Sequence, residues 1–159
     1  AQAMNNIHLV DVRDPSNPVL IAEFPYPEVP EDFPYPNFNV MNLGCQGPFG
    51  PHNVHEPMSN KPWLEQSNAL VYNCYFAAGL RIFDVRDPYY IKEVAYFIPP
   101  NPNKTPEESY FKGFPGPRNA CTEDCCVDDR GYIYVTCLDD GFYVLKRTGK
   151  AAEIPAVME

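Results

Sequence analysis

Two histidines and a glutamate lie close together in the segment GPHNVHEP, where they could bind a metal ion. His52, His55 and Glu56 would offer two imidazoles and a carboxylate, and histidine is the commonest side-chain ligand of transition metals. A strand would turn the two histidines to opposite faces, so joint binding needs a turn between them. Two alternatives remain open: the histidines contact a substrate, or they are structural and hydrogen bond to backbone.

Acidic residues supply further candidate ligands. Glu123 and Asp124 occupy the aligned position of a later sequence repeat and would reach the same site. The pairs Asp128-Asp129 and Asp139-Asp140 could hold Ca²⁺ through carboxylate oxygens. Both pairs also precede a glycine where a tight hairpin favours Asp and Gly, so turn chemistry is the better interpretation. The sequence has no G-x-S-x-G elbow, Gly-rich phosphate loop or H-E-x-x-H motif, which leaves open whether the protein is an enzyme.

The cysteines indicate an exported protein with disulfides. Their number is even and their spacing matches no zinc site of the C-x-x-C type. The sequence does not choose among the possible pairings, and six buried thiols are the alternative. Neighbouring cysteines on a strand point to opposite faces, so Cys125 and Cys126 should have different partners. The six are Cys45, Cys74, Cys121, Cys125, Cys126 and Cys137.

Charge and hydropathy exclude two classes of partner. The net charge is −9, with only 12 Lys and Arg residues. A protein that neutralises phosphates needs a basic surface, so nucleic acid is excluded as a partner. No segment approaches the roughly 20 apolar residues of a membrane span.

Alternating apolar residues predict an all-β chain of short strands. The 19 prolines disfavour long helices, and they concentrate in two long loop insertions, 25–62 and 99–118. The tail, 148–159, carries no strong signal. The predicted strands are 7–12, 19–24, 70–75, 80–85, 91–97, 123–127, 132–138 and 142–146.

The strands recur as an internal repeat, which favours a β-propeller. Residues 7–24 align with 80–97 through a shared D-V-R-D-P, and alignment on Gly79 and Gly141 gives a third copy. Residues 7–24 would supply the outer strands of one blade, 52–97 a complete blade, and 122–147 three strands of another. We therefore predict a partial propeller of about two and a half four-stranded blades. The chain, 1–159, would be one domain, the C-terminal part of a larger propeller. An irregular β-sandwich is the alternative.

The repeat core GLRIFDVRDP, residues 79–88, resembles that of the LVIVD-repeat family of β-propellers. The resemblance extends to PHNVHE at 51–56 and to DDRGYIYVT at 128–136, and the cysteines depart from it. It implies an exported propeller and says little about activity. Such propellers are distantly similar to selenium-binding proteins, some of which are copper-dependent methanethiol oxidases with histidine ligands in the channel.

Two functions follow as hypotheses. The first is an extracellular or periplasmic scaffold whose partners are the remaining blades, from the same precursor or another chain, and other proteins. The second is a metal-dependent enzyme, such as an oxidoreductase, with His52 and His55 in the propeller channel.

Overall fold

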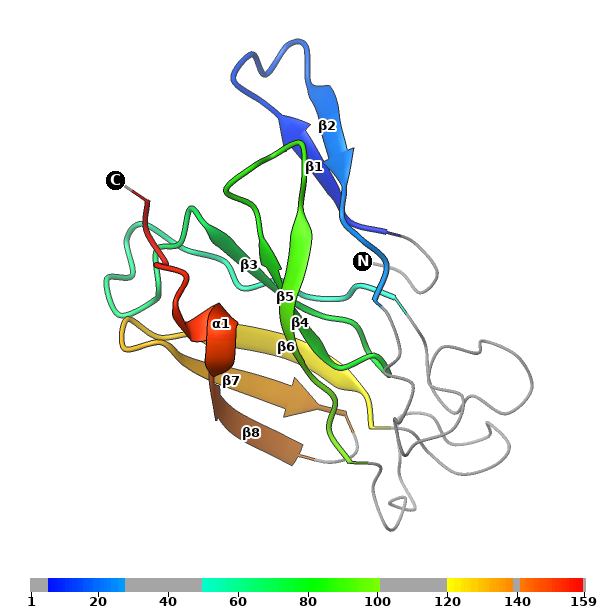
Figure 1. Ribbon diagram of the computed structural model, residues 1–159, viewed down its shortest axis with the longest axis vertical. Coiled ribbons are helices and arrows are strands. Elements are labelled where there is room, and N and C mark those ends of the chain that lie inside the picture. Colours follow the sequence, from blue (N-terminus) through cyan, green and yellow to red (C-terminus); the bar gives the residue numbers. More distant parts are fainter. Residues whose placement is uncertain (1–5, 28–49, 101–119, 139–140, 159) are drawn as a thin grey trace, which may run out of the picture.

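A computed structural model describes residues 6–27, 50–100, 120–138 and 141–158. This part of the chain is all-β and forms three small antiparallel sheets (Figure 1). The first contains β1 (His8–Asp11) and β2 (Val19–Glu23). The second contains β3 (Leu70–Cys74), β4 (Leu80–Asp84) and β5 (Lys92–Phe97). The third contains β6 (Thr122–Val127), β7 (Tyr132–Cys137) and β8 (Gly141–Lys146).

The predicted strands are confirmed to within one residue at each end. The short helix α1 (Gly149–Ala152) lies in the tail, where the sequence carried no strong signal. None of the described helices has the length and apolar character that a membrane crossing requires. Most of the two proline-rich loops, Cys45 and the pair Asp139-Asp140 lie outside the described residues.

A short extended segment adds to the edge of the middle sheet. The His52 N–H donates to the Cys74 carbonyl at 2.7 Å, the Cys74 N–H to the Asn53 carbonyl at 2.9 Å, and the His55 N–H to the Tyr72 carbonyl at 3.0 Å. Residues 52–55 therefore pair antiparallel with β3. The segment 52–55 thus lies beside β3, at the edge of the sheet opposite β5.

The internal repeat is visible in the backbone as well as in the sequence. The register of β1 with β2 shifts between Leu9 and Val10, and that of β4 with β5 shifts between Ile82 and Phe83. These positions coincide in the sequence alignment of the two repeats. A β-bulge bends and twists its strand, so the aligned segments share a distortion as well as a strand pattern.

The middle sheet is covered on both sides. One face packs against the third sheet through a cluster to which β3, β4, β6 and β7 contribute. The other face packs against the first sheet, where Phe24 meets Phe83 edge-on with ring centroids 5.1 Å apart. The buried side chains of the larger cluster are Ala69, Leu70, Tyr72, Cys74, Leu80, Ile82, Cys125, Val127, Ile133 and Val135.

The tail after α1 returns to the residues that precede β3. The Asn68 N–H donates to the Ala156 carbonyl at 3.1 Å, and the Ser67 hydroxyl donates to the same carbonyl at 2.7 Å. The Met158 N–H donates to Asn68 Oδ1 at 2.7 Å. These bonds attach the end of the third unit to the middle one.

The turn between β6 and β7 uses Asp128 as the sequence predicts. Its Oδ1 accepts the N–H groups of Arg130 and Tyr132, each at 3.0 Å, and its Oδ2 accepts from the Arg130 guanidinium and the Tyr134 hydroxyl. Asp11 with Arg13 and Asp84 with Arg86 make the same aspartate-to-arginine contact. Both carboxylate oxygens of Asp128 therefore take part in the turn.

We expect this turn to make stability dependent on pH. Desolvation opposes ionisation, but hydrogen bonds from Arg130, Tyr132 and Tyr134 outweigh it and lower the pKa of Asp128 from 3.8 to about 2. The lowered pKa stabilises the fold above about pH 4, and this contribution is lost as the pH falls through about 2. Asp128→Asn should therefore lower the Tm at neutral pH and flatten its decline in acid, as measured by circular dichroism.

Asp129→Asn is the matched control for this prediction. Asp129 is exposed and contributes its backbone N–H, which donates to the Trp63 carbonyl at 2.9 Å. The substitution removes the same charge from the same turn. An equal loss of Tm in both variants, or an undiminished acid decline in Asp128→Asn, would contradict the assignment.

Candidate functional site

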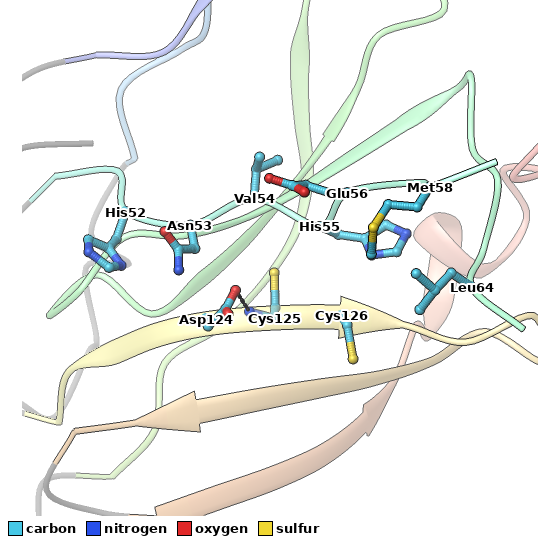
Figure 2. A pocket seen from close by; sticks show the side chains of 10 residues that line it. All are labelled: His52, Asn53, Val54, His55, Glu56, Met58, Leu64, Asp124, Cys125 and Cys126. Atoms are coloured by element: carbon cyan, nitrogen blue, oxygen red, sulfur yellow. Dashed lines mark hydrogen bonds between the residues drawn. The ribbon is translucent and has the colours of Figure 1, made fainter. Parts of the chain in front are cut away.

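The predicted site residues gather around one pocket of about 490 Å³. Residues 52–64 form one wall and β6 the other (Figure 2). His52, His55, Glu56 and Asp124 line the pocket, and Glu123 contacts it through His52. The complete lining is His52, Asn53, Val54, His55, Glu56, Met58, Leu64, Asp124, Cys125 and Cys126.

His55 has a structural role in this arrangement. Its side chain is buried, and its Nδ1 lies 3.2 Å from the Val127 backbone nitrogen. Because an N–H group can only donate, Nδ1 is the acceptor. The proton therefore sits on Nε2, which donates to the Glu65 carbonyl at 2.9 Å. Both ring nitrogens are engaged with backbone, so a metal could bind His55 only by displacing one of these bonds.

His52 is more accessible and keeps one ring nitrogen for a ligand. Its Nδ1 donates to the Glu123 carbonyl at 2.8 Å and lies 3.4 Å from Glu123 Oε1. The ring packs on Phe76 with centroids 4.5 Å apart. Figure 2 shows the His52 and His55 rings well apart along the pocket. The two histidines do not form a joint binding site here.

The carboxylates differ in what they offer. The Glu123 Oε2 atom is buried and has no hydrogen-bond partner among the described residues. Asp124 Oδ1 accepts the Cys125 N–H at 2.8 Å, and Glu56 is exposed. Within the described ranges, no three His, Cys, Asp or Glu side chains are grouped so that they could hold a metal ion. Any metal at this pocket would need ligands from elsewhere.

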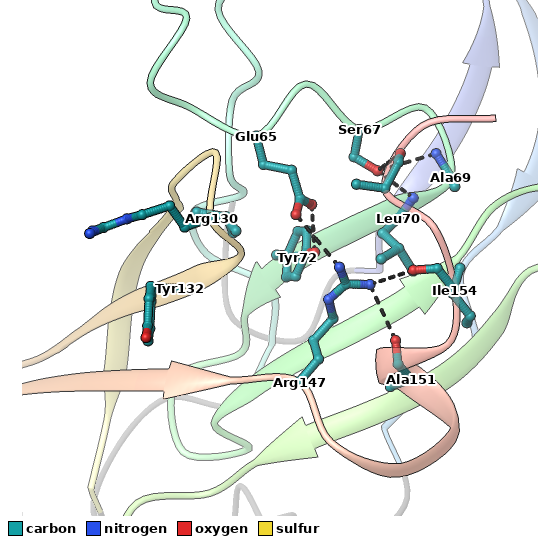
Figure 3. Close-up of polar contacts among 12 residues, drawn as sticks. Glu65, Ser67, Ala69, Leu70, Tyr72, Arg130, Tyr132, Arg147, Ala151 and Ile154 are labelled. Carbon is teal, nitrogen blue, oxygen red and sulfur yellow. Dashed lines mark hydrogen bonds and ion pairs between the residues drawn. The ribbon is translucent and has the colours of Figure 1, made fainter. Parts of the chain in front are cut away.

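A buried polar cluster behind the pocket was not predicted from the sequence. Tyr72 donates its hydroxyl to Glu65 Oε1 at 2.6 Å, and Arg147 lies 3.7 Å from Glu65 Oε2. Arg147 also donates to the carbonyls of Ala151 and Ile154 (Figure 3). Burial and the bond to Glu65 raise the pKa of the Tyr72 hydroxyl. Because the Glu65 carbonyl accepts from His55, this cluster positions the pocket wall.

No disulfide is seen between the cysteines of the described residues, so the disulfides expected from the sequence stay a prediction. The opposite orientation predicted for the adjacent pair is confirmed. Cys125 is buried against β3 while Cys126 is exposed, and their sulfurs point to opposite sides of β6 (Figure 2). Cys125 Sγ lies 3.7 Å from the Tyr72 carbonyl oxygen.

Comparison with known proteins adds no relative: no protein-family model, curated protein or solved structure matches the chain.

Proposed function

We propose that this chain is part of an exported β-propeller of the LVIVD type that acts as a binding and assembly scaffold. Three antiparallel sheets in sequence order, with the middle one packed on both faces, support this proposal. The aligned bulges and the repeated aspartate–arginine turns support repetition of one structural unit. Further blades, from the same precursor or another chain, are the first partners of this scaffold.

The observation that carries the proposal is the apolar surface at both ends of the sheet series. On the first sheet, the cross-strand pair Val10 and Leu20 is 41% and 58% exposed. On the third sheet, Phe142 and Val144 of β8 are 59% and 55% exposed, and Tyr134 stacks on Phe142. Contiguous exposed apolar patches mark interaction surfaces. The middle sheet shows how such faces are covered, namely by another sheet of the same kind.

Footprinting of the protein as isolated tests this proposal. Hydroxyl-radical labelling should modify Phe142 slowly, because a neighbouring blade covers it. Trp63, which is 56% exposed in the loop that precedes β3, is the reference and should react rapidly. The double variant Phe142→Asp/Val144→Asp should lower the assembly mass measured by light scattering. Equal labelling of Phe142 and Trp63, with an unchanged mass in the variant, would overturn the proposal.

A metal-dependent enzyme is the second candidate, and one observation favours it. A metal-binding histidine usually donates one ring N–H to a carbonyl or carboxylate, which orients the other nitrogen toward the metal. His52 makes such a bond to Glu123, whose buried Oε2 lacks a partner among the described residues. In such an enzyme, His52 Nε2 would be one metal ligand and further blades would supply the remaining ligands. The bound metal would activate a substrate in the propeller channel.

Elemental analysis of the purified protein separates the two candidates. The metal-dependent enzyme requires near-stoichiometric Cu, Fe, Zn or Mn, and His52→Ala should lose most of it. His8→Ala is the control, because His8 is an exposed histidine that contacts Glu23 at 3.0 Å on β2. Metal content that is negligible in the wild type, or equal in both variants, would count against the enzyme.

A further inference from the structure

Two thiols meet at the interface between the middle and third sheets. Cys74 ends β3 and Cys125 lies within β6, and these strands pack against each other. Both side chains belong to the same buried cluster. Cys125 Sγ lies 3.7 Å from the carbonyl oxygen of Tyr72, two residues before Cys74 on the same strand. Interaction with Cys125, together with burial, raises the pKa of the Cys74 thiol. The two sulfurs are therefore neighbours although their residues lie on different sheets.

The backbone on each side holds these thiols in place. Cys74 bonds through its carbonyl to the His52 N–H and through its N–H to the Asn53 carbonyl. Cys125 pairs with Val135 in the ladder between β6 and β7. Each thiol is therefore carried by a backbone segment whose position is fixed by hydrogen bonds to neighbouring segments.

We propose that Cys74 and Cys125 form a disulfide that joins β3 to β6 when the protein meets a low-molecular-weight disulfide. Cys125 lines the pocket whereas Cys74 is completely buried, so an oxidant reaches Cys125 before Cys74. Its thiolate attacks one sulfur of the reagent, and one thiolate of the reagent leaves. The deprotonated Cys74 then attacks Cys125 Sγ and expels the second thiolate. The two protons lost by the cysteines end on the two released thiols, and the reagent takes up the two electrons.

The neighbouring cysteine does not compete for this bond. Cys126 is exposed and lies on the opposite face of β6. Adjacent cysteines in a regular strand point apart, and Cys125 and Cys126 oppose Val135 and Tyr134 in unbroken register. This link is independent of whether the chain assembles into a propeller.

Peptide mapping after oxidation tests the proposal directly. The protein is incubated with oxidised glutathione, alkylated, and digested without reduction. We expect a linked peptide pair containing Cys74 and Cys125, lighter than the sum of the two reduced peptides by two hydrogen atoms. A dominant link from either residue to Cys45, Cys121, Cys126 or Cys137 would overturn the assignment, as would alkylation of both thiols after prolonged oxidation.

Thermal unfolding supplies an independent measurement. Oxidation should raise the Tm of the wild type, because the bond restricts the unfolded chain, and a thiol reductant should reverse the rise. Cys126→Ser should retain the full rise, whereas Cys125→Ser should lose it. An equal rise in both variants would overturn the proposal. Peptide mapping uses the wild-type protein only. It therefore tests the Cys74–Cys125 disulfide even if Cys125→Ser does not fold.

Discussion

Gly79→Ala should lower the free energy of unfolding by about 3–5 kcal/mol, the range of severe core substitutions. Gly79 closes the turn from β3 to β4 with φ of +78°, and a Cβ there would lie 2.2 Å from the Phe97 carbonyl oxygen and 2.8 Å from Ile98 Cα. Both atoms belong to backbone at the end of β5, so relief requires the strand to move. Urea denaturation monitored by circular dichroism measures the loss.

Gly131→Ala is the matched control for this prediction. Gly131 has φ of +79°, and the space where a Cβ would be added has no atom within 4 Å. The substitution should therefore lower the free energy of unfolding by roughly 1–2 kcal/mol, the cost of a left-handed backbone conformation at alanine, with no added steric clash. Similar losses in the two variants would mean that Phe97 and Ile98 do not restrict Gly79.

Glu93→Ala should destabilise the fold by about 3 kcal/mol, because it leaves a cation in the protein interior. The Arg81 side chain is completely buried, and its NH1 donates to Glu93 Oε1 at 2.8 Å. Its Nε donates to the Ala78 carbonyl at 2.9 Å, and its guanidinium lies over the Tyr96 ring. The loss is measured by urea denaturation at neutral pH.

A double-mutant cycle with Arg81→Met provides the control. Methionine retains much of the arginine stem and removes the charge that Glu93 compensates. The double variant should therefore be less destabilised than the sum of the single variants, with a coupling energy of at least about 1 kcal/mol. Strict additivity would show that Arg81 and Glu93 contribute independently.

The strands could be predicted from the sequence because their signals are local. Alternation in 80–85 and the turn residues Asp87-Pro88 lie within a few positions of the structure that they specify. The two register shifts fall at aligned positions of the repeat, but nothing in the sequence indicates that a β-bulge is present there. The approach of Phe97 to Gly79 could not be predicted, because it depends on the register between β4 and β5.

The sequence indicated which residues of the candidate site lie near one another, but not which groups they contact. Residue type and alignment brought His52, His55 and Asp124 to one pocket. They could not show that the Val127 N–H and the Glu65 carbonyl bond to the two ring nitrogens of His55. Every residue type except proline offers the same backbone groups, so residue identity does not reveal such partners. The pairing of Glu65 with Arg147 was equally hidden, since the two residues come from distant elements.

The bonds between Asn68 and the tail bear on the order in which the chain folds. Asn68 and Met158 are separated by 90 positions, whereas each meander pairs strands that are neighbours in sequence. Local pairings close short loops and form early, and contacts of large sequence separation form late because chain entropy opposes them. We therefore infer that the meanders form first and the tail docks last. Hydrogen exchange should follow the same order, with the Met158 amide opening at a lower free energy than the amides of β4.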